Sequence, residues 1–145
     1  MTGQNGSEAR LIDGNALSLK LRADFADRAR QLAERGVRPG LAVILVGENP
    51  ASAVYVRNKV AACEKAGIRS LRFDYPVAVD PTEVLSQIAA LNADPSVHGI
   101  LVQLPLPPQF NSEAVLDAVS PDKDVDGFHA QNVGLLAQGT PAFVP

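Results

Sequence analysis

The sequence has little cysteine and no long hydrophobic run, and both features narrow the class of protein. Cys63 is the only cysteine among 145 residues, so a disulfide framework within the chain is excluded. This composition suits a reducing compartment, and we interpret Cys63 as a small buried side chain rather than a reactive thiol. No apolar stretch reaches the roughly 20 residues of a membrane span, and residues 1–8 are polar, unlike a signal or transit peptide. We therefore expect a cytoplasmic protein without membrane contact.

Runs of one charge and the common ligand motifs are also missing. The formal net charge is −3 and lysine and arginine form no cluster, so we expect no nucleic-acid partner. The glycine-rich dinucleotide loop, the Walker loop and zinc-ligand spacings are absent. His98 and His129 lie far apart in the sequence and indicate no metal site. With 46% hydrophobic and 20% charged residues, the chain has the balance of an ordinary globular domain.

Helical and strand-like segments alternate along the chain. Apolar side chains recur every three or four residues over 11–35, which predicts a helix that Gly36 ends. The apolar run 41–46 predicts a strand buried on both faces, and 70–77 a more polar strand nearer a sheet edge. The remaining predicted elements are helices over 52–66, 81–92 and 113–119 and a strand over 97–104. The stretch 132–145 predicts a short helix that begins at Asn132, followed by a proline-bounded strand or linker. This order predicts an α/β fold, a three-layer α-β-α sandwich with a mostly parallel sheet.

The first segment that could carry chemistry spans residues 47–59, after the buried strand. Tyr55 and Lys59 are four residues apart, which places both side chains on one face of a helix. A phenol beside an ammonium can handle protons, although a lysine amine acts as a base near neutral pH only where its surroundings lower its pKa. An ordinary solvated surface pair is the alternative.

The second segment begins at Gln103, which interrupts an otherwise apolar strand just before a proline bend. A polar amide in a buried strand must find partners or it costs about 1–3 kcal/mol. The sequence leaves two readings open, an amide bonded to neighbouring backbone and an amide in a binding site.

The third segment is the acidic turn 121–128. Asp124 and Asp126 flank Val125, so they point to opposite sides if the chain is extended. One carboxylate can then face a pocket while the other holds the loop together. A solvated turn is the alternative.

Together these segments resemble the bifunctional methylenetetrahydrofolate dehydrogenase/methenyltetrahydrofolate cyclohydrolase family. The residues that carry the resemblance are Val46-Gly47, Pro50-Ala51-Ser52, Tyr55, Lys59 and Gly67-Ile68, then 99–107, then Pro121, 123–128 and Asn132-Val133-Gly134. The resemblance covers the chain from about Ala9. It departs from the family at Ala61, where a second lysine is common, and in length, because family members continue well beyond the point where this sequence ends.

The resemblance implies a role for each matching residue. Lys59 would be the central catalytic lysine, Tyr55 would pack along the folate and orient it, and Gln103 would tune Lys59. Asp126 would hold the pterin, whose adjacent N–H donors suit a carboxylate. The implied catalytic residues are Lys59, Tyr55 and Gln103, and the implied substrate-binding residues are Ser52, Tyr55, Lys59, Gln103, Leu104, Pro105 and Asp126.

The resemblance also implies a division of the chain. Residues 1–8 would form a disordered tail, 9–133 the folate-binding catalytic domain, and 134–145 a connector toward an NADP-binding domain absent from this sequence. The sequence does not decide between NADP and NAD, because the residues that would decide it are absent.

The implied function lies in one-carbon metabolism, which serves purine biosynthesis. The full-length protein would be a homodimer that oxidises 5,10-methylenetetrahydrofolate with NADP and hydrolyses the 5,10-methenyl product to 10-formyltetrahydrofolate. This chain alone would lack the dehydrogenase activity. The alternatives are a folate-binding or oligomerisation module without turnover, and a generic α/β domain in which Tyr55 and Lys59 are merely a surface pair.

Overall fold

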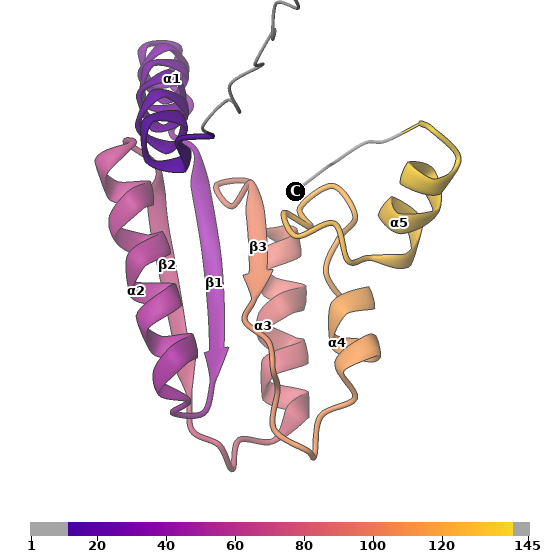
Figure 1. Cartoon of the computed structure of the whole chain (residues 1–145). Coiled ribbons are helices and arrows are strands. Elements are labelled where there is room, and N and C mark those ends of the chain that lie inside the picture. The colour runs from indigo at the N-terminus through magenta and orange to yellow at the C-terminus, as the bar shows by residue number, and fades with distance from the viewer. Residues whose placement is uncertain (1–11, 141–145) are drawn as a thin grey trace, which may run out of the picture.

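A parallel sheet of three strands forms the centre of the computed structural model, which describes residues 12–140 (Figure 1). The strands are β1 (Gly40–Val46), β2 (Arg69–Tyr75) and β3 (Gly99–Val102), in the order β2-β1-β3. β1 pairs in parallel with both neighbours. The predicted parallel sheet and the edge position of the more polar strand are thus confirmed. The predicted tail over 1–8 and the end of the predicted connector lie outside the described residues.

Five helices accompany the strands within residues 12–140. They are α1 (Gly14–Glu34), α2 (Pro50–Lys65), α3 (Pro81–Ala93), α4 (Ser112–Asp117) and α5 (Ala130–Ala137). Side chains cap most of these helices at their first turn, as with Asp80, whose carboxylate accepts a hydrogen bond from the Thr82 N–H at 2.8 Å. The alternation of helices and strands predicted from the sequence is therefore present.

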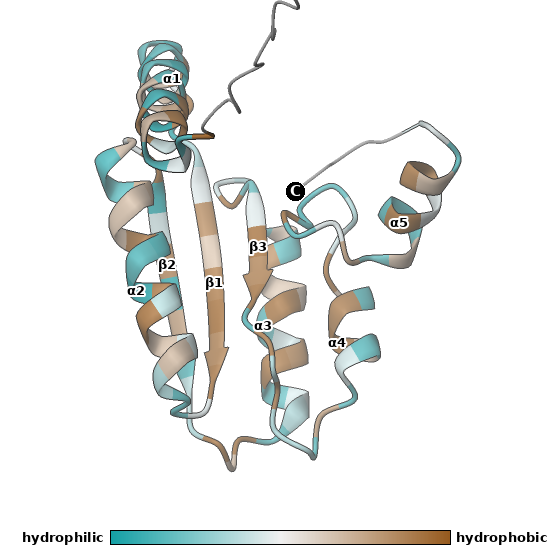
Figure 2. Ribbon diagram, viewed as in Figure 1, coloured by the Kyte–Doolittle hydropathy of each residue, from teal (hydrophilic) through white to brown (hydrophobic). Residues whose placement is uncertain are grey.

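The two faces of β1 supply two separate hydrophobic cores, because successive side chains of a strand point to opposite faces. Val43 and Leu45 pack with Val56 of α2 on one face. Ile44 packs on the other face in a larger cluster that includes Ile88 of α3 and residues of α4. Figure 2 shows hydrophobic residues concentrated along β1, β3 and α3. Helices thus cover both faces of the sheet, which confirms the three-layer arrangement.

α1 forms where its apolar repeat predicts a helix, but most of that repeat is not buried. Ala29 is buried and lies beside Gly67, just past the end of α2. Leu17, Leu21 and Phe25 of the same stripe are 53%, 42% and 48% exposed. Within the described residues, only the C-terminal part of this stripe meets the rest of the fold.

β3 is shorter than the predicted strand over 97–104. It begins at Gly99 and ends at Val102, so Gln103 lies just beyond the strand rather than within it. The Gln103 N–H still donates to the carbonyl oxygen of Ile44 at 2.9 Å. Pairing stops there because Pro105, which follows a cis Leu104–Pro105 peptide bond, has no N–H to donate.

α5 begins two residues earlier than expected. The His129 side chain accepts a hydrogen bond from the Gln131 N–H through Nδ1, at 3.1 Å, and so caps the helix before residue 132. α5 also runs across residue 134, where the connector was expected to begin. The division into domains stays a prediction.

Lys123 ties the chain after α4 to the end of α3. Its Nζ donates to the carbonyl oxygens of Leu91, Asn92 and Asp94, at 3.0, 2.8 and 2.8 Å. The last carbonyls of a helix lack partners within the helix, and they carry partial negative charge. A half-buried ammonium that serves three such groups is a fixed part of the fold rather than a solvated lysine.

Lys123→Met is expected to lower the free energy of unfolding by about 1–3 kcal/mol, because three hydrogen bonds to a charged group are lost. Urea unfolding measures the loss. Lys20→Met is the matched control, since Lys20 is exposed on α1, and it should change stability by less than about 0.5 kcal/mol. Equal stability of the two variants would contradict a structural role for Lys123.

Candidate active site

A hollow lies between the start of α2 and the segment that follows β3. Its volume is about 430 Å³, and we call it the α2–β3 hollow. It is lined by Asn49, Ala51, Ser52, Tyr55, Gln103, Leu104 and Pro105. Five of the seven predicted site residues therefore share one surface, although they come from two segments about 50 residues apart in the sequence.

The turn from β1 into α2 sets one wall of the α2–β3 hollow. Gly47 adopts φ of 85°, a left-handed conformation that favours glycine. The Asn49 side chain then accepts hydrogen bonds from the N–H groups of Ala51 and Ser52, at 3.0 and 3.2 Å. Sequence reasoning did not assign Asn49 to the site, although an Asn-Pro pair ahead of a helix is a known start signal.

Tyr55 and Lys59 meet as their spacing predicts. The Lys59 Nζ lies 4.5 Å from the centroid of the Tyr55 ring, within the range of a cation–π interaction. Tyr55 is 54% exposed, so a face of its ring is free to pack against a ligand. Lys59 does not itself line the hollow, but its ammonium lies above the ring of Tyr55, which does.

The Gln103 side-chain amide donates a hydrogen bond but accepts none within the described residues. Its Nε2 donates to the carbonyl oxygen of Leu104 at 2.8 Å, while its Oε1 is buried without a partner among the described residues. An unpaired buried acceptor costs about 1–3 kcal/mol. Backbone thus binds the donor of Gln103, as one of the two readings expects, and the reading as an amide in a binding site stays a prediction.

Asp126 does not line the α2–β3 hollow but lies close enough to Lys59 to interact with it electrostatically. Burial raises the pKa of the Asp126 carboxyl above its ordinary value, the Lys59 ammonium opposes this rise, and the Asp124 carboxylate adds to it. Asp126 makes no salt bridge within the described residues. Its carboxylate is partly desolvated and has no fixed partner there.

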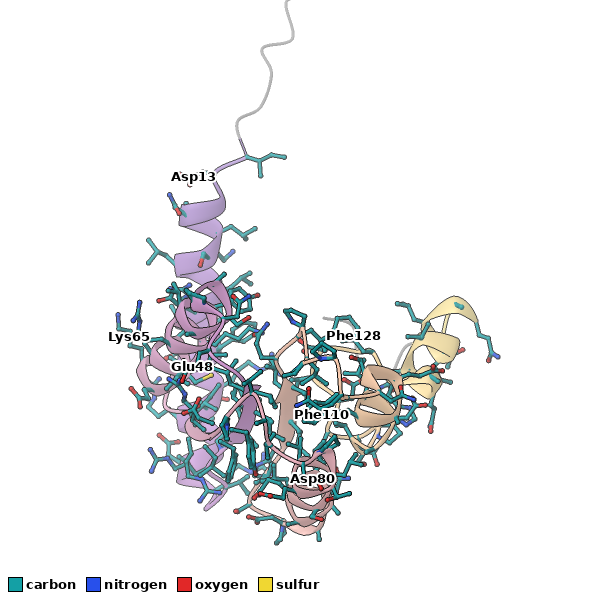
Figure 3. The ribbon with its side chains drawn as sticks, turned by 90° about the horizontal axis from the view of Figure 1, so that it is seen from below. Asp13, Glu48, Lys65, Asp80, Phe110 and Phe128 are labelled. Atoms are coloured by element: carbon teal, nitrogen blue, oxygen red, sulfur yellow. The ribbon has the colours of Figure 1, made fainter. Side chains whose placement is uncertain are left out.

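The segment 121–129, which we call the Asp126 loop, lies beside β3 rather than beyond its carboxyl end. Asp124 forms an isolated parallel bridge with Ile100, and the Ile100 N–H donates to the Lys123 carbonyl oxygen at 2.7 Å. The loop therefore extends the sheet along β3. Figure 3 shows Phe128 of this loop on the same side of the sheet as Glu48, opposite Asp80 at the start of α3.

The alternation around Val125 predicts that one of the two aspartates holds the loop together, and that residue is Asp124. Asp124 is buried, and its Oδ2 accepts hydrogen bonds from the His129 N–H and from Asn132 Nδ2, at 2.8 and 3.0 Å. It holds the loop together. That Asp126 faces a ligand stays a prediction.

Other parts of the described structure are weaker candidates for a functional site. A larger hollow of about 530 Å³ includes Arg69 and His98 in its lining, at the amino ends of the strands, but the Arg69 guanidinium already donates to the Ser96 hydroxyl at 2.6 Å. Burial raises the pKa of the Cys63 thiol, which favours the unreactive protonated form. Within residues 12–140, no cluster of three metal-binding side chains occurs, and no helix is long and apolar enough to span a membrane.

Known proteins resemble this chain closely in sequence. A family model described as tetrahydrofolate dehydrogenase/cyclohydrolase, catalytic domain, matches residues 12–126. The chain is 71% identical over 137 residues to the bifunctional protein FolD of Azoarcus sp. (strain BH72), and 60% identical over 137 residues to that of Bordetella avium (strain 197N). These matches cover 94% of this chain but 47% and 48% of the relatives. The chain thus spans about half the length of the curated relatives it matches.

Solved structures agree. The bifunctional FolD methylenetetrahydrofolate dehydrogenase/cyclohydrolase of Campylobacter jejuni is 46% identical and superimposes with a TM-score of 0.90, over 92% of this chain and 48% of that one. The dehydrogenase-cyclohydrolase of Trypanosoma brucei, solved with NADP cofactor and inhibitor, is 35% identical with a TM-score of 0.89, over 94% and 48%. The chain therefore belongs to the tetrahydrofolate dehydrogenase/cyclohydrolase family, as its three motifs predict.

Proposed function

We propose that this chain binds a tetrahydrofolate derivative in the α2–β3 hollow and hydrolyses its methenyl form with Lys59 as the base. The observation that carries the proposal is the Lys59 Nζ 4.5 Å from the centroid of the Tyr55 ring, with Tyr55 and Gln103 both lining the α2–β3 hollow. This set combines a proton acceptor, a hydrogen-bond acceptor and an aromatic platform. Ser52, Leu104 and Pro105 would complete the contacts with the substrate.

Asp126 would recognise the pterin. The aminopyrimidinone edge of a pterin presents adjacent N–H donors, which a carboxylate can bind through both oxygens. The Asp126 carboxyl is partly buried without a fixed partner, so a ligand would not have to displace an existing contact. The exposed face of Tyr55 would pack along the folate, which places the reacting carbon on the side of Lys59.

The hydrolytic step needs a base and little else. The water oxygen would bond to the methenyl carbon while the neutral Lys59 amine takes one of the water protons. The carbon–N5 bond would then break, with the remaining hydroxyl proton passing to N5 and the formyl group staying on N10. Gln103, which lines the same hollow as Tyr55, would help to orient the amine.

NADP does not fit the residues described. A dinucleotide pyrophosphate binds free N–H groups at the start of a helix that follows a glycine-rich turn. At the start of α2, Asn49 already occupies the N–H groups of Ala51 and Ser52, and Pro50 has none. We therefore assign these residues no part in holding the cofactor. Oxidation of methylenetetrahydrofolate with NADP, like the homodimer and the connector over 134–145, is proposed for the complete protein only.

A folate-binding module without turnover is the rival function. The rate of 5,10-methenyltetrahydrofolate hydrolysis distinguishes the two functions. The enzyme should raise this rate above the rate in buffer alone, measured as loss of the methenyl absorbance. Binding of 5-formyltetrahydrofolate, a stable tetrahydrofolate, without any accelerated hydrolysis would favour the module.

Lys59→Ala is expected to lower the rate of methenyl hydrolysis by about 10²–10⁴-fold, the usual contribution of a general base. Binding of 5-formyltetrahydrofolate should change far less. Lys65→Ala removes an exposed lysine from the same helix and should keep the full rate. Full activity of Lys59→Ala would overturn the proposed mechanism.

Asp126→Ala is expected to weaken binding of 5-formyltetrahydrofolate by about 1–3 kcal/mol, the range for a hydrogen bond to a charged group. Titration calorimetry measures the change. Asp122→Ala, at an exposed position of the same loop, is the matched control. Unchanged affinity in Asp126→Ala would remove Asp126 from the site.

Asp126→Asn is expected to stabilise the protein near pH 7 and to lose that advantage in acid. Burial raises the pKa of the Asp126 carboxyl in the folded state, so stability falls as pH rises from the ordinary value of about 3.9 through the folded-state pKa. The neutral amide avoids this penalty. Urea unfolding of both proteins at pH 7 and near pH 3 should show a gain that shrinks at the lower pH, and a constant gain would contradict the burial argument.

A further inference from the structure

We propose that Asp124 and Asn132 form a buried clamp that positions Asp126 for the folate, so that both are positioning residues of the site. The proposal rests on the proposed function, because it gives Asp126 the task of binding the pterin. Asn132 begins the last part of the third motif, Asn132-Val133-Gly134, and the reaction itself leaves it without a role. We call the pair the Asp124–Asn132 clamp.

The clamp closes the Asp126 loop on itself. Asn132 is 2% exposed, and its Nδ2 donates both to Asp124 Oδ2 and to the carbonyl oxygen of Pro121, each at 3.0 Å. Asp124 Oδ2 also accepts from the His129 N–H at 2.8 Å. The first residue of the loop, its middle and its last residue are thus held by two side chains. Asp126 lies inside this closed ring of contacts.

The same loop is seated against β3 at close range. A Cβ atom added to Gly99 would lie 2.5 Å from Cγ1 of Val125, which is tighter than ordinary packing allows. The Ile100 N–H donates to the Lys123 carbonyl oxygen at 2.7 Å. Val125 and Lys123 are therefore fixed to the sheet on either side of Asp124. Asp126, the next residue after Val125, has little freedom to move.

A buried carboxylate is a poor choice if the only requirement is stability. Removing a charge from water is unfavourable, and well-packed hydrophobic groups often stabilise a protein as well as a buried ion does. Hydrogen bonds to a charged oxygen, by contrast, fix the distance and direction of the groups that make them. The Asp124 carboxylate also repels the Asp126 carboxylate, which lies two positions further along the chain. The N–H donors of a bound pterin would partly offset this repulsion, which would couple the clamp to the ligand.

Asn132→Ala tests the clamp without touching the α2–β3 hollow, whose lining excludes Asn132. We expect 5-formyltetrahydrofolate to bind about 5- to 20-fold more weakly, the range of coupling between residues of one network. In the Asp126→Ala background the same substitution should add no further loss, because the clamp acts through Asp126. Ile88→Val, a buried change in α3, controls for lowered stability and should leave the dissociation constant unchanged.

A second measurement does not depend on the ligand. Hydrogen exchange of the His129 amide should accelerate in Asn132→Ala, because its acceptor Asp124 loses its own restraint. If Asn132→Ala fails to fold, Asn132→Ser, which keeps a shorter donor, is measured in the same ways.

Three results would overturn the clamp as a positioning device. The first is an unchanged affinity of Asn132→Ala for 5-formyltetrahydrofolate while Asp126→Ala binds it weakly. The second is a double variant whose loss of affinity is the sum of the two single losses. The third is an unchanged rate of hydrogen exchange at the His129 amide in Asn132→Ala. Failure of the unaltered chain to bind 5-formyltetrahydrofolate would instead overturn the proposed function, and the positioning role with it, even if the His129 amide exchanges faster.

Discussion

The burial of β1 between two parallel neighbours is the constraint on which the rest of the structure depends. Residues 42–46 are at most 4% exposed, so both faces must be covered by helices. Parallel neighbours require crossover connections, and those connections are α2 and α3. The start of α2 is thereby fixed close to the end of β1. The segment after β3 reaches the same region because β3 pairs with β1 on its other side.

The side chains of the candidate site are incompletely satisfied, in contrast to the core around them. Gln103 keeps a buried acceptor without a partner, and the Asp126 carboxyl is partly desolvated. Each lowers the stability of the free protein. A polar ligand can use such unmet hydrogen-bonding capacity. The same property explains why active sites often lower the stability of the free protein.

Local signals in the sequence predict local structure well. The buried strand, the polar edge strand and the meeting of Tyr55 with Lys59 all depend on residues close together in the chain, and each is found as predicted. The exposure of Leu17 and Phe25 was missed, since an apolar stripe looks the same whether or not a partner covers it. The pairing of Asp124 with Asn132 was missed because nothing in a spacing of eight residues specifies a buried contact.

Lys123 gives the molecule one further property. Its backbone carbonyl pairs with β3 within the Asp126 loop, while its ammonium bonds to the end of α3, on the opposite face of the sheet. The last turn of α3 and the loop therefore open and close as one cooperative unit. Any ligand that binds the ordered loop stabilises that helix end as well.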